Sequence, residues 1–277
     1  MTLIMIMRGG GDLASGVALR LTHSGFKVII TELPEPLMVR RTVSFAEAVY
    51  AGKAAVEGVE SVLAEDWTKI KGILIDGCIP VLVDPELQSL ENLRRVQDQK
   101  DQIVLVDARM NKKPPEKPLD DDVFQIGLGP GFYAGLNCHA VIETNRGHNL
   151  GRVIWQGTAE EDSGVPESVI SQGRMRVLRA ENCGPLVSKT EIGDHLEQGQ
   201  VIAEISGKPV LAPFRGVLRG LLHSGLDVWP GLKIGDVDPR DDPNYCFQVS
   251  DKSLAVGGAV LEAILSQTRL RPFLWDS

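Results

Sequence analysis

The stretch LIMIMRGGGDLASG, residues 3–16, decides the expected fold of this chain. Its apolar run, Leu3 to Met7, is typical of a strand covered on both faces. After the glycine-rich turn, Val17 to His23 places apolar residues at helical spacing. A second apolar run, Lys27 to Thr31, ends at Glu32. Strand, glycine turn, helix and strand together predict a βαβ unit.

The glycine turn matches the G-x-G-x-x-G/A fingerprint of dinucleotide-binding domains. Glycine lets the backbone approach a pyrophosphate, and the helix that follows offers free N–H groups. Glu32, 21 residues after the second fingerprint glycine, lies where an acid would contact a ribose hydroxyl. We therefore predict that the turn binds a nucleotide through Gly9, Gly10, Gly11, Asp12 and Ala14. The alternative is a tight turn that needs glycine only for its backbone geometry.

A rigid Pro-x-Pro loop follows Glu32 and leads to Arg40 and Arg41. Two arginines beside a pyrophosphate site could clamp a further phosphate. The alternative is a solvated basic turn.

Repeated strand and helix patterns continue to residue 107, which predicts a doubly wound parallel sheet. Ligands of such sheets lie at the carboxyl ends of strands, where Asp76, Cys78, Asp107 and Arg109 are found. The expected elements are a helix at 42–50, a strand or hairpin at 54–64, strands at 72–76, 80–84 and 102–107, and a helix at 86–99.

A second glycine-rich stretch follows a Pro-rich charged linker at 111–122. Its free N–H groups predict an anion cradle formed by Gly127, Gly129 and Gly131. The next window holds Cys138, His139 and Arg146. We expect Arg146 to contact the same ligand.

Cys138, His139 and Cys78 are the candidate catalytic residues. A thiolate would suit a sulfur, selenium or transition-metal species. Neither HExxH nor paired-cysteine spacing occurs, so no metal site is predicted. The alternative is a core or interface histidine beside a small buried cysteine.

Residues 177–205 and 208–237 repeat with an offset of 32 and carry glycines at matched places. They predict a pseudo-symmetric β-sandwich and resemble the lipoyl/biotinyl barrel-sandwich family. Lys208, on the hairpin between the halves, precedes Ala212 by only four residues. A scaffold or docking module is therefore favoured over a carrier of a modified lysine.

The expected fold class is α/β, a Rossmann-like doubly wound parallel sheet plus a C-terminal β-rich barrel-sandwich domain. The expected boundaries are 1–125 for the Rossmann-like nucleotide-binding domain, 126–172 for the central glycine-rich segment, 173–240 for the repeat, and 241–277 for a strand and helix packing back on the first domain.

Composition narrows the class of protein. The net charge of −8 argues against a nucleic-acid partner. No apolar run approaches the ~20 residues of a membrane span, and neither a basic region nor a cleavage site flanks the short apolar start. None of the four cysteines forms a CxxC pair. We expect free thiols in a reducing cytoplasm.

Five stretches together resemble YqeB-type proteins of the selenium-dependent molybdenum hydroxylase system. They are RGGGDLASG (8–16), VRRTVSFAEAVY (39–50), IGLGPGF (126–132), NCHAVIETNRGHNLG (137–151) and GDVDPR (235–240). The resemblance implies an accessory role in maturing a molybdenum hydroxylase that carries labile selenium. It also implies kinship with XdhC-type accessory proteins, which handle the molybdenum pterin cofactor and have a Rossmann-like domain.

The first hypothesis is therefore an accessory protein that binds molybdopterin dinucleotide and assists its modification or insertion. Its partners would be a molybdenum hydroxylase or that enzyme's maturation proteins. The second is an NAD(P)-binding oxidoreductase, and the third a scaffold that docks a hydroxylase through the repeat. Whether the protein catalyses a reaction or only binds, and whether it forms a homo-oligomer, stays open.

Overall fold

The computed structural model describes residues 3–88, 90–92, 102–115, 120, 122–161 and 174–274. The chain is a mixed α/β protein with one large sheet and two smaller antiparallel sheets. It forms two compact units. Unit 1 comprises Met1–Pro36, Phe45–Asp162 and Val249–Ser277, and unit 2 comprises Leu37–Ser44 and Ser163–Gln248.

These units differ from the expected boundaries in three places. The stretch from residue 126 is no separate segment, because its strands extend the large sheet of unit 1. Residues 37–44 leave unit 1 and join the repeat, although they lie between two elements of unit 1. The chain returns to unit 1 at Val249 rather than at residue 241.

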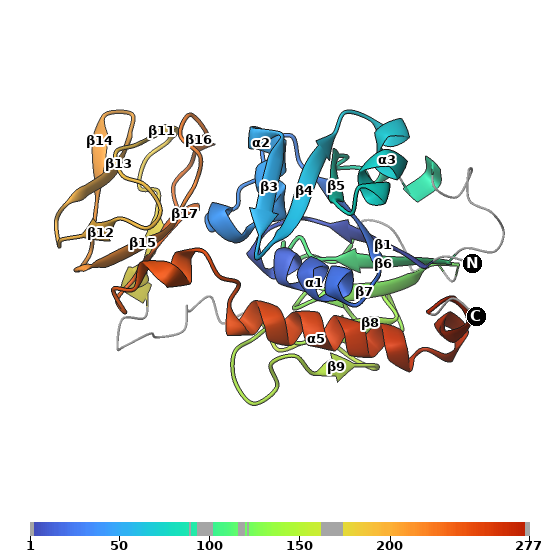
Figure 1. Cartoon of the computed structure of the whole chain (residues 1–277). Coiled ribbons are helices and arrows are strands. Elements are labelled where there is room, and N and C mark those ends of the chain that lie inside the picture. Colours follow the sequence, from blue (N-terminus) through green and yellow to red (C-terminus); the bar gives the residue numbers. More distant parts are fainter. Residues whose placement is uncertain are drawn as a thin grey trace. The chain divides into compact units, whose positions relative to one another are not determined.

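The large sheet of unit 1 has the order β3-β4-β5-β2-β1-β6-β7-β8-β9 (Figure 1). Adjacent strands from β4 to β8 are parallel, and the β3–β4 and β8–β9 pairs are antiparallel. Its strands are β1 (Leu3–Arg8), β2 (Lys27–Glu32), β3 (Lys53–Val56), β4 (Val59–Ala64), β5 (Ile79–Val83), β6 (Gln102–Asp107), β7 (Phe124–Leu128), β8 (Ala140–Ile142) and β9 (Val153–Ile154). The expected strands at 80–84 and 102–107 and the hairpin at 54–64 are confirmed.

The expected strand at 72–76 is wrong, because this segment is part of helix α3 (Ile70–Ile75). Asp66 accepts a hydrogen bond from the Thr68 N–H at 2.7 Å and begins the 3₁₀ turn η3 (Trp67–Lys69), which runs into α3. A four-residue apolar run does not distinguish a short helix from a strand. The capping aspartate was the stronger signal.

The expected helix at 42–50 is broken into η1 (Arg41–Val43), η2 (Phe45–Glu47) and α2 (Ala48–Ala51). The break falls where the chain passes from unit 2 to unit 1. Gly52 ends α2 in the left-handed conformation, with φ of 76°. The expected helix at 86–99 lies largely outside the described residues.

Two helices cross closely on unit 1, α1 (Asp12–His23) and α5 (Asp251–Ser266) (Figure 1). A Cβ on Gly16 would lie 2.5 Å from the Ser253 Cβ, and one on Gly257 would lie 2.7 Å from the Gly16 carbonyl oxygen. The helices therefore touch backbone to backbone, which only glycine permits. The expected C-terminal helix does pack on the first unit, but the strand expected before it in 241–277 is wrong, because Pro243–Cys246 form the 3₁₀ turn η5 and the chain belongs to unit 2 up to Gln248. The 3₁₀ turn η6 (Thr268–Phe273) follows α5.

Unit 2 consists of two four-stranded antiparallel sheets, β10-β17-β15-β12 and β14-β13-β11-β16. Each strand from β10 to β13 has a counterpart 32 residues later, from β14 to β17. When every strand is replaced by its counterpart, the strand order of one sheet becomes the strand order of the other, which confirms the predicted pseudo-symmetry. The strands are β10 (Val177–Arg179), β11 (Gly184–Ser188), β12 (His195–Leu196), β13 (Val201–Ile205), β14 (Lys208–Leu211), β15 (Gly216–Leu221), β16 (Asp227–Val228) and β17 (Lys233–Asp238). The turns η4 (Arg174–Arg176) and η5 (Pro243–Cys246) flank them.

Among the described residues, no helix is both long enough and apolar enough to cross a membrane.

Candidate functional site

The candidate site lies at the carboxyl edge of the parallel strands of unit 1. From β1 the chain moves to β2 and β5 on one side, and then to β6, β7 and β8 on the other. Such a reversal between β1 and β6 is where ligands of open α/β sheets bind. The two glycine stretches follow β1 and β7, so they lie on the same edge with β6 between them.

The first glycine loop is held from several sides. The Gly9 N–H donates to the Thr31 carbonyl at 2.8 Å. The Gly10 carbonyl accepts from the Ala46 N–H at 2.9 Å and from the Ser15 hydroxyl at 3.1 Å. Gly11 occupies the N-cap position of α1, and no side chain accepts a hydrogen bond from the free N–H groups there. A Cβ built on Gly11 would meet nothing within 4 Å. The loop is therefore rigid, and the space beside Gly11 is open.

Glu32 binds the loop itself. Its Oε1 accepts from the Gly10 N–H at 2.6 Å and its Oε2 from the Leu33 N–H at 2.8 Å. Burial raises the pKa of Glu32 above the ordinary 4.5, against the opposing effect of these two hydrogen bonds. Glu32, which was expected to contact a ribose hydroxyl, thus binds the Gly10 N–H, which was expected to contact a pyrophosphate. The amide of Gly10 is not available to a ligand while this pair persists.

Arg40 and Arg41 belong to unit 2, not to the unit that carries the first glycine loop. Arg40 donates to the carbonyls of Tyr245 and Gln248, each at 3.0 Å. Arg41 donates to the Leu221 carbonyl at 2.8 Å. The expectation that they clamp a phosphate beside the loop is corrected: Arg41 ties residues 37–44 to the repeat, and Arg40 ties them to the segment 245–248 of the same unit.

The second glycine stretch is filled by its own neighbours. The Phe132 ring lies where a Cβ of Gly127 would be, and a Cβ on Gly129 would lie 2.5 Å from the Thr144 hydroxyl. A Cβ on Gly131 would lie 2.7 Å from the Lys113 carbonyl oxygen. These three glycines therefore make room for protein atoms, and the expected anion cradle is not formed. The sequence shows glycine spacing but not which atoms occupy the space.

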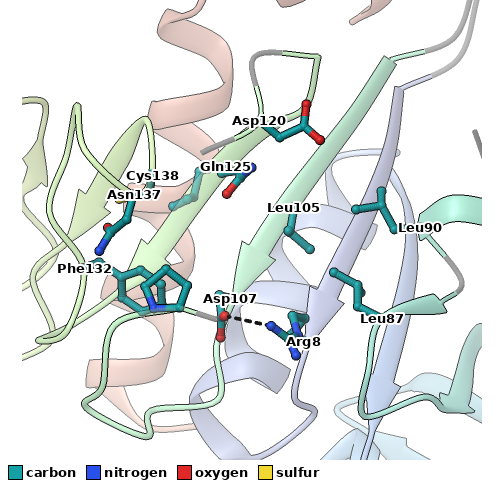
Figure 2. A pocket seen from close by; sticks show the side chains of 12 residues that line it. Arg8, Leu87, Leu90, Leu105, Asp107, Asp120, Gln125, Phe132, Asn137 and Cys138 are labelled. Carbon is teal, nitrogen blue, oxygen red and sulfur yellow. Dashed lines mark ion pairs between the residues drawn. The ribbon is translucent and has the colours of Figure 1, made fainter. Parts of the chain in front are cut away.

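A small cavity lies beside this stretch, along one face of β6 and β7 (Figure 2). Arg8 and Asp107 stand at one end, where their strands end, and an ion pair of 3.6 Å joins them. Asp107 also accepts two hydrogen bonds from the Arg109 guanidinium, at 2.9 and 2.7 Å. With a volume of about 60 Å³, the cavity holds a few waters rather than a dinucleotide.

Cys138 lines the cavity, but its thiol is not activated. The residue is buried, and burial raises the pKa of Cys138 to about 12. A group with this pKa is a thiol at neutral pH and a poor nucleophile. Cys138 packs with Phe132 and Val141 as a small apolar residue.

The other residues of the polar cluster do not converge on Cys138. His139 contacts Phe124 and accepts from the Gln125 N–H at 3.1 Å. Arg146 pairs with the Asp251 carboxylate at the start of α5, at 2.6 and 2.5 Å. Its guanidinium is thereby directed to a carboxylate of the protein rather than to the expected ligand.

Cys78 lies elsewhere, before β5, with its thiol 3.8 Å from the Glu60 carboxylate. Burial and the nearby carboxylates raise its pKa as well. Within the described part of the chain, no group of three or more His, Cys, Asp or Glu side chains could hold a metal ion.

Two residues that shape the edge were not among the predicted residues, namely Arg8 and Ser15, whereas Arg109 was expected at a strand end. Ser15 links the loop to the next segment, because its hydroxyl also accepts from the Phe45 N–H at 2.8 Å. Arg8 donates to the Pro85 carbonyl at 3.0 Å and so joins the ends of β1 and β5. The signal was available for Arg8, which directly follows an apolar run that predicts a strand.

No family model matches the chain, but a search of known proteins finds a relative with a similar sequence. The chain is 45% identical over 262 residues to the Escherichia coli (strain K12) protein described as "Uncharacterized protein YqeB". An aspartoacylase family protein of Mesorhizobium loti covers 85% of this chain and 84% of its own, with 10% identity and a TM-score of 0.24, too slight a likeness to indicate a shared fold. The match to YqeB covers 95% of this chain and 47% of that relative. The chain is thus YqeB-like along nearly its whole sequence and spans about half the length of the curated relative it matches.

Proposed function

We propose that the protein is an accessory factor for a selenium-dependent molybdenum hydroxylase and that unit 1 binds the nucleotide part of a molybdopterin dinucleotide. In this proposal unit 1 is a Rossmann-like domain, and unit 2 is a barrel-sandwich module. Support comes from the strand order around β1 and from the open N-terminus of α1 at Gly11. The role in hydroxylase maturation follows from the resemblance of the motifs.

The observation that carries the nucleotide site is the combination of Gly11 and Glu32. The N-terminus of α1 directs backbone N–H groups and a partial positive charge toward the open space beside Gly11. Glu32 ends the next strand and reaches the loop, so a ribose hydroxyl could take the place of the Gly10 N–H as its partner. The residues of the first loop fit a diphosphate, whereas those of the second loop do not.

The cofactor would supply the molybdenum and the dithiolene chemistry, and this chain would bind and orient it. Gly11 and the first turn of α1 would accept the diphosphate. Arg8 and Arg109, on either side of Asp107, would place positive charge at the mouth of the crevice. Cys138 would not act as a nucleophile at neutral pH, because its pKa is about 12.

Calorimetry with CDP, GDP, ADP and NAD, followed by the purified pterin dinucleotide, tests the proposal. Gly11→Val should block the site without straining the fold, because Gly11 has an ordinary φ of −67° and an added Cβ meets no described protein atom within 4 Å. Gly72→Val is the matched control in unit 1, since its added Cβ also meets nothing within 4 Å. We expect binding to the wild type and to Gly72→Val but not to Gly11→Val. Absence of binding to the wild type, or equal binding to both variants, refutes the proposal.

The second candidate is an NAD(P)-dependent oxidoreductase, which the same loop and Glu32 favour. Hydride transfer also needs a positioned acid or base. His139 instead packs against the Phe124 ring and accepts from the Gln125 N–H. Binding of NAD in preference to the other nucleotides, with turnover seen as a change in nicotinamide absorbance, would favour this candidate over the first.

A further inference from the structure

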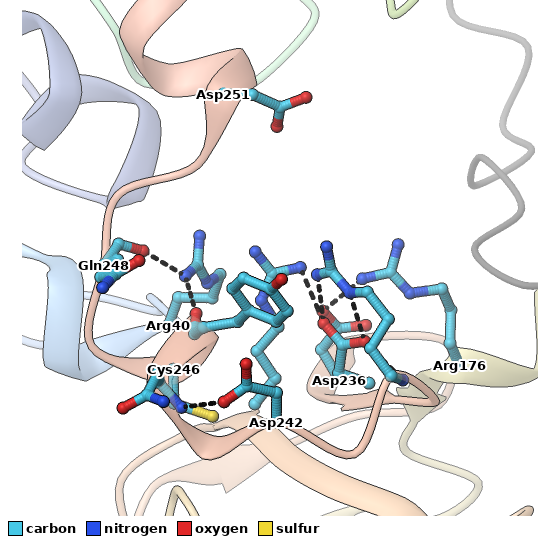
Figure 3. A network of polar contacts seen from close by, with 12 residues as sticks. Arg40, Arg176, Asp236, Asp242, Cys246, Gln248 and Asp251 are labelled. Carbon is cyan, nitrogen blue, oxygen red and sulfur yellow. Dashed lines mark hydrogen bonds and ion pairs between the residues drawn. The ribbon is translucent and has the colours of Figure 1, made fainter.

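Unit 2 contains a cluster of four arginines that the nucleotide site does not use. The cluster consists of Arg40, Arg176, Arg219 and Arg240, gathered around Asp236 and Asp238 (Figure 3). Figure 3 shows Arg40 and Arg176 at opposite ends of the group, with the Asp236 carboxylate between them. We call it the arginine cluster.

The fold of unit 2 brings these side chains together from separate segments. Arg219 lies at a β-bulge of β15, where the pairing with β17 shifts between Leu218 and Gly220. A bulge changes the direction of the side chain that it carries. A Cβ on Gly220 would lie 2.7 Å from the Val39 carbonyl oxygen, so this glycine allows residues 37–44 to pack there and deliver Arg40.

The cluster contains more positive than negative groups. Arg176 pairs with Asp236 at 2.8 Å, and Arg219 and Arg240 pair with Asp238 at 3.5 and 2.5 Å. Four guanidinium groups therefore face two carboxylates. A third carboxylate, Asp242, accepts from the Asn244 N–H at 3.0 Å and caps η5. Among the described residues of the cluster, cations remain in the majority even when Asp242 is counted.

The ionisation of the cluster reflects this imbalance. Burial and the nearby Arg40 lower the pKa of Arg219 to about 10. Burial alone would raise the pKa of Asp238, but hydrogen bonds from Arg240 and the charges of Arg240 and Arg219 hold it below its ordinary value. An added anion would relieve the repulsion among the guanidinium groups.

Several polar atoms of the cluster are buried and have no hydrogen-bond partner among the described residues. They are Nε of Arg176, Nε of Arg219 and Oδ1 of Asp236. Two are donors and one is an acceptor. Buried polar groups are nearly always paired, so such atoms call for a ligand or an ordered water. A hydrogen phosphate group matches this set, since it has several acceptor oxygens and one O–H donor.

The cluster is also preorganised and accessible from solvent. The Arg240 guanidinium stacks over the Tyr245 ring at 4.2 Å, and Arg40 is fixed by the carbonyls of Tyr245 and Gln248. The Arg240 side chain is 34% exposed, while those of Arg219 and Arg176 are 11% and 13% exposed. An anion would approach past Arg240, the most exposed of these three side chains.

We propose that the arginine cluster of unit 2 binds a phosphate group of a small molecule, whereas the first glycine loop, which carries the proposed nucleotide site, belongs to unit 1. Planar guanidinium groups bind phosphate oxygens in pairs, which favours phosphate over a spherical anion. The site takes either free phosphate or the terminal phosphate of an ester.

The test is calorimetry and thermal unfolding of the full chain with inorganic phosphate, glycerol 2-phosphate and pyrophosphate, against sodium chloride at equal ionic strength. Free phosphate and the ester distinguish the two sources. We expect phosphate to raise the unfolding temperature more than chloride does. Arg219→Gln and Arg176→Gln should each weaken binding by about tenfold, the effect of losing one charge-assisted hydrogen bond.

Arg179→Gln is the matched control, because Arg179 is an exposed arginine of the same unit outside the cluster. It should bind phosphate as the wild type does. Gly11→Val should also keep phosphate binding, so failure of this site is distinguishable from failure of the nucleotide site. Equal stabilisation by phosphate and chloride, or unchanged affinity in Arg176→Gln, refutes the proposal. If Arg219→Gln fails to fold, Arg176→Gln at the edge of the cluster decides.

Discussion

Two adjacent glycines of α5 should respond in opposite ways to the same substitution. Gly257 faces α1, where an added Cβ would lie 2.7 Å from the Gly16 carbonyl oxygen and 2.9 Å from the Arg20 Cγ. Gly258 is exposed, and its added Cβ would meet nothing within 4 Å. The two positions share helix, neighbours in sequence and intrinsic propensity, so they isolate the effect of packing.

The magnitude follows from two terms. Replacing glycine by alanine in the interior of a helix stabilises it by about 0.5–1 kcal/mol. At Gly257 the helices must also move apart by several tenths of an ångström, and overpacking of this kind costs about 1–3 kcal/mol. Gly258→Ala should therefore gain about 0.5–1 kcal/mol, whereas Gly257→Ala should lose roughly 1–2 kcal/mol.

Urea denaturation followed by far-ultraviolet circular dichroism measures the difference, and thermal unfolding should show it as roughly 2–4 °C per kcal/mol. Gly258→Ala should unfold above the wild type and Gly257→Ala below it. The reasoning fails if Gly257→Ala is as stable as Gly258→Ala, because α5 would then not contact α1 backbone to backbone.

Three further predictions concern single side chains. Iodoacetamide at neutral pH should label the exposed Cys183 well before the buried Cys138, whose pKa is about 12, and equal labelling in peptide mass spectra would contradict the assigned burial. The stability of the wild type relative to Glu32→Gln should fall as the pH rises above 4.5. The reason is that the folded-state pKa of Glu32 lies above the unfolded value, so its ionised form opposes folding. The difference in unfolding free energy between wild type and Glu32→Gln should therefore change with pH between pH 4 and 7, and a constant difference would contradict the raised pKa of Glu32. Asp66→Ala removes the cap of the η3–α3 segment and should lower the midpoint of urea denaturation, while an unchanged midpoint would show that the cap does not contribute.

Local patterns predicted much of unit 1 and unit 2 because their signals lie within a few residues. The apolar run before Gly9 and the amphipathic segment after it predicted β1 and α1, both of which are confirmed. The offset of 32 predicted the paired strands of unit 2 because a duplicated fold repeats its turns. Where a run was too short to show a period, as in α3, the prediction failed.

The candidate site was predicted less completely, because its geometry depends on contacts between distant residues. Glycine spacing identified both loops, but only the first keeps open space beside one of its glycines, Gly11. The fillers of the second, Phe132, Thr144 and Lys113, could not be assigned from the sequence. Nor could the placement of Arg40, which follows from a close approach to Gly220 in a different part of the chain.

By itself, the sequence determined the βαβ start, the duplicated repeat and the return of the C-terminal helix to unit 1, since periodicity and glycine spacing are local properties. Only the tertiary structure decided which backbone amides are already bonded and which arginines share a carboxylate. The Glu32 carboxylate on the Gly10 N–H and the gathering of Arg40 with Arg219 both arise from segments that meet only after folding. Hydrogen bonds and ion pairs act over a few ångströms, so they depend on distance in space and not on distance along the chain.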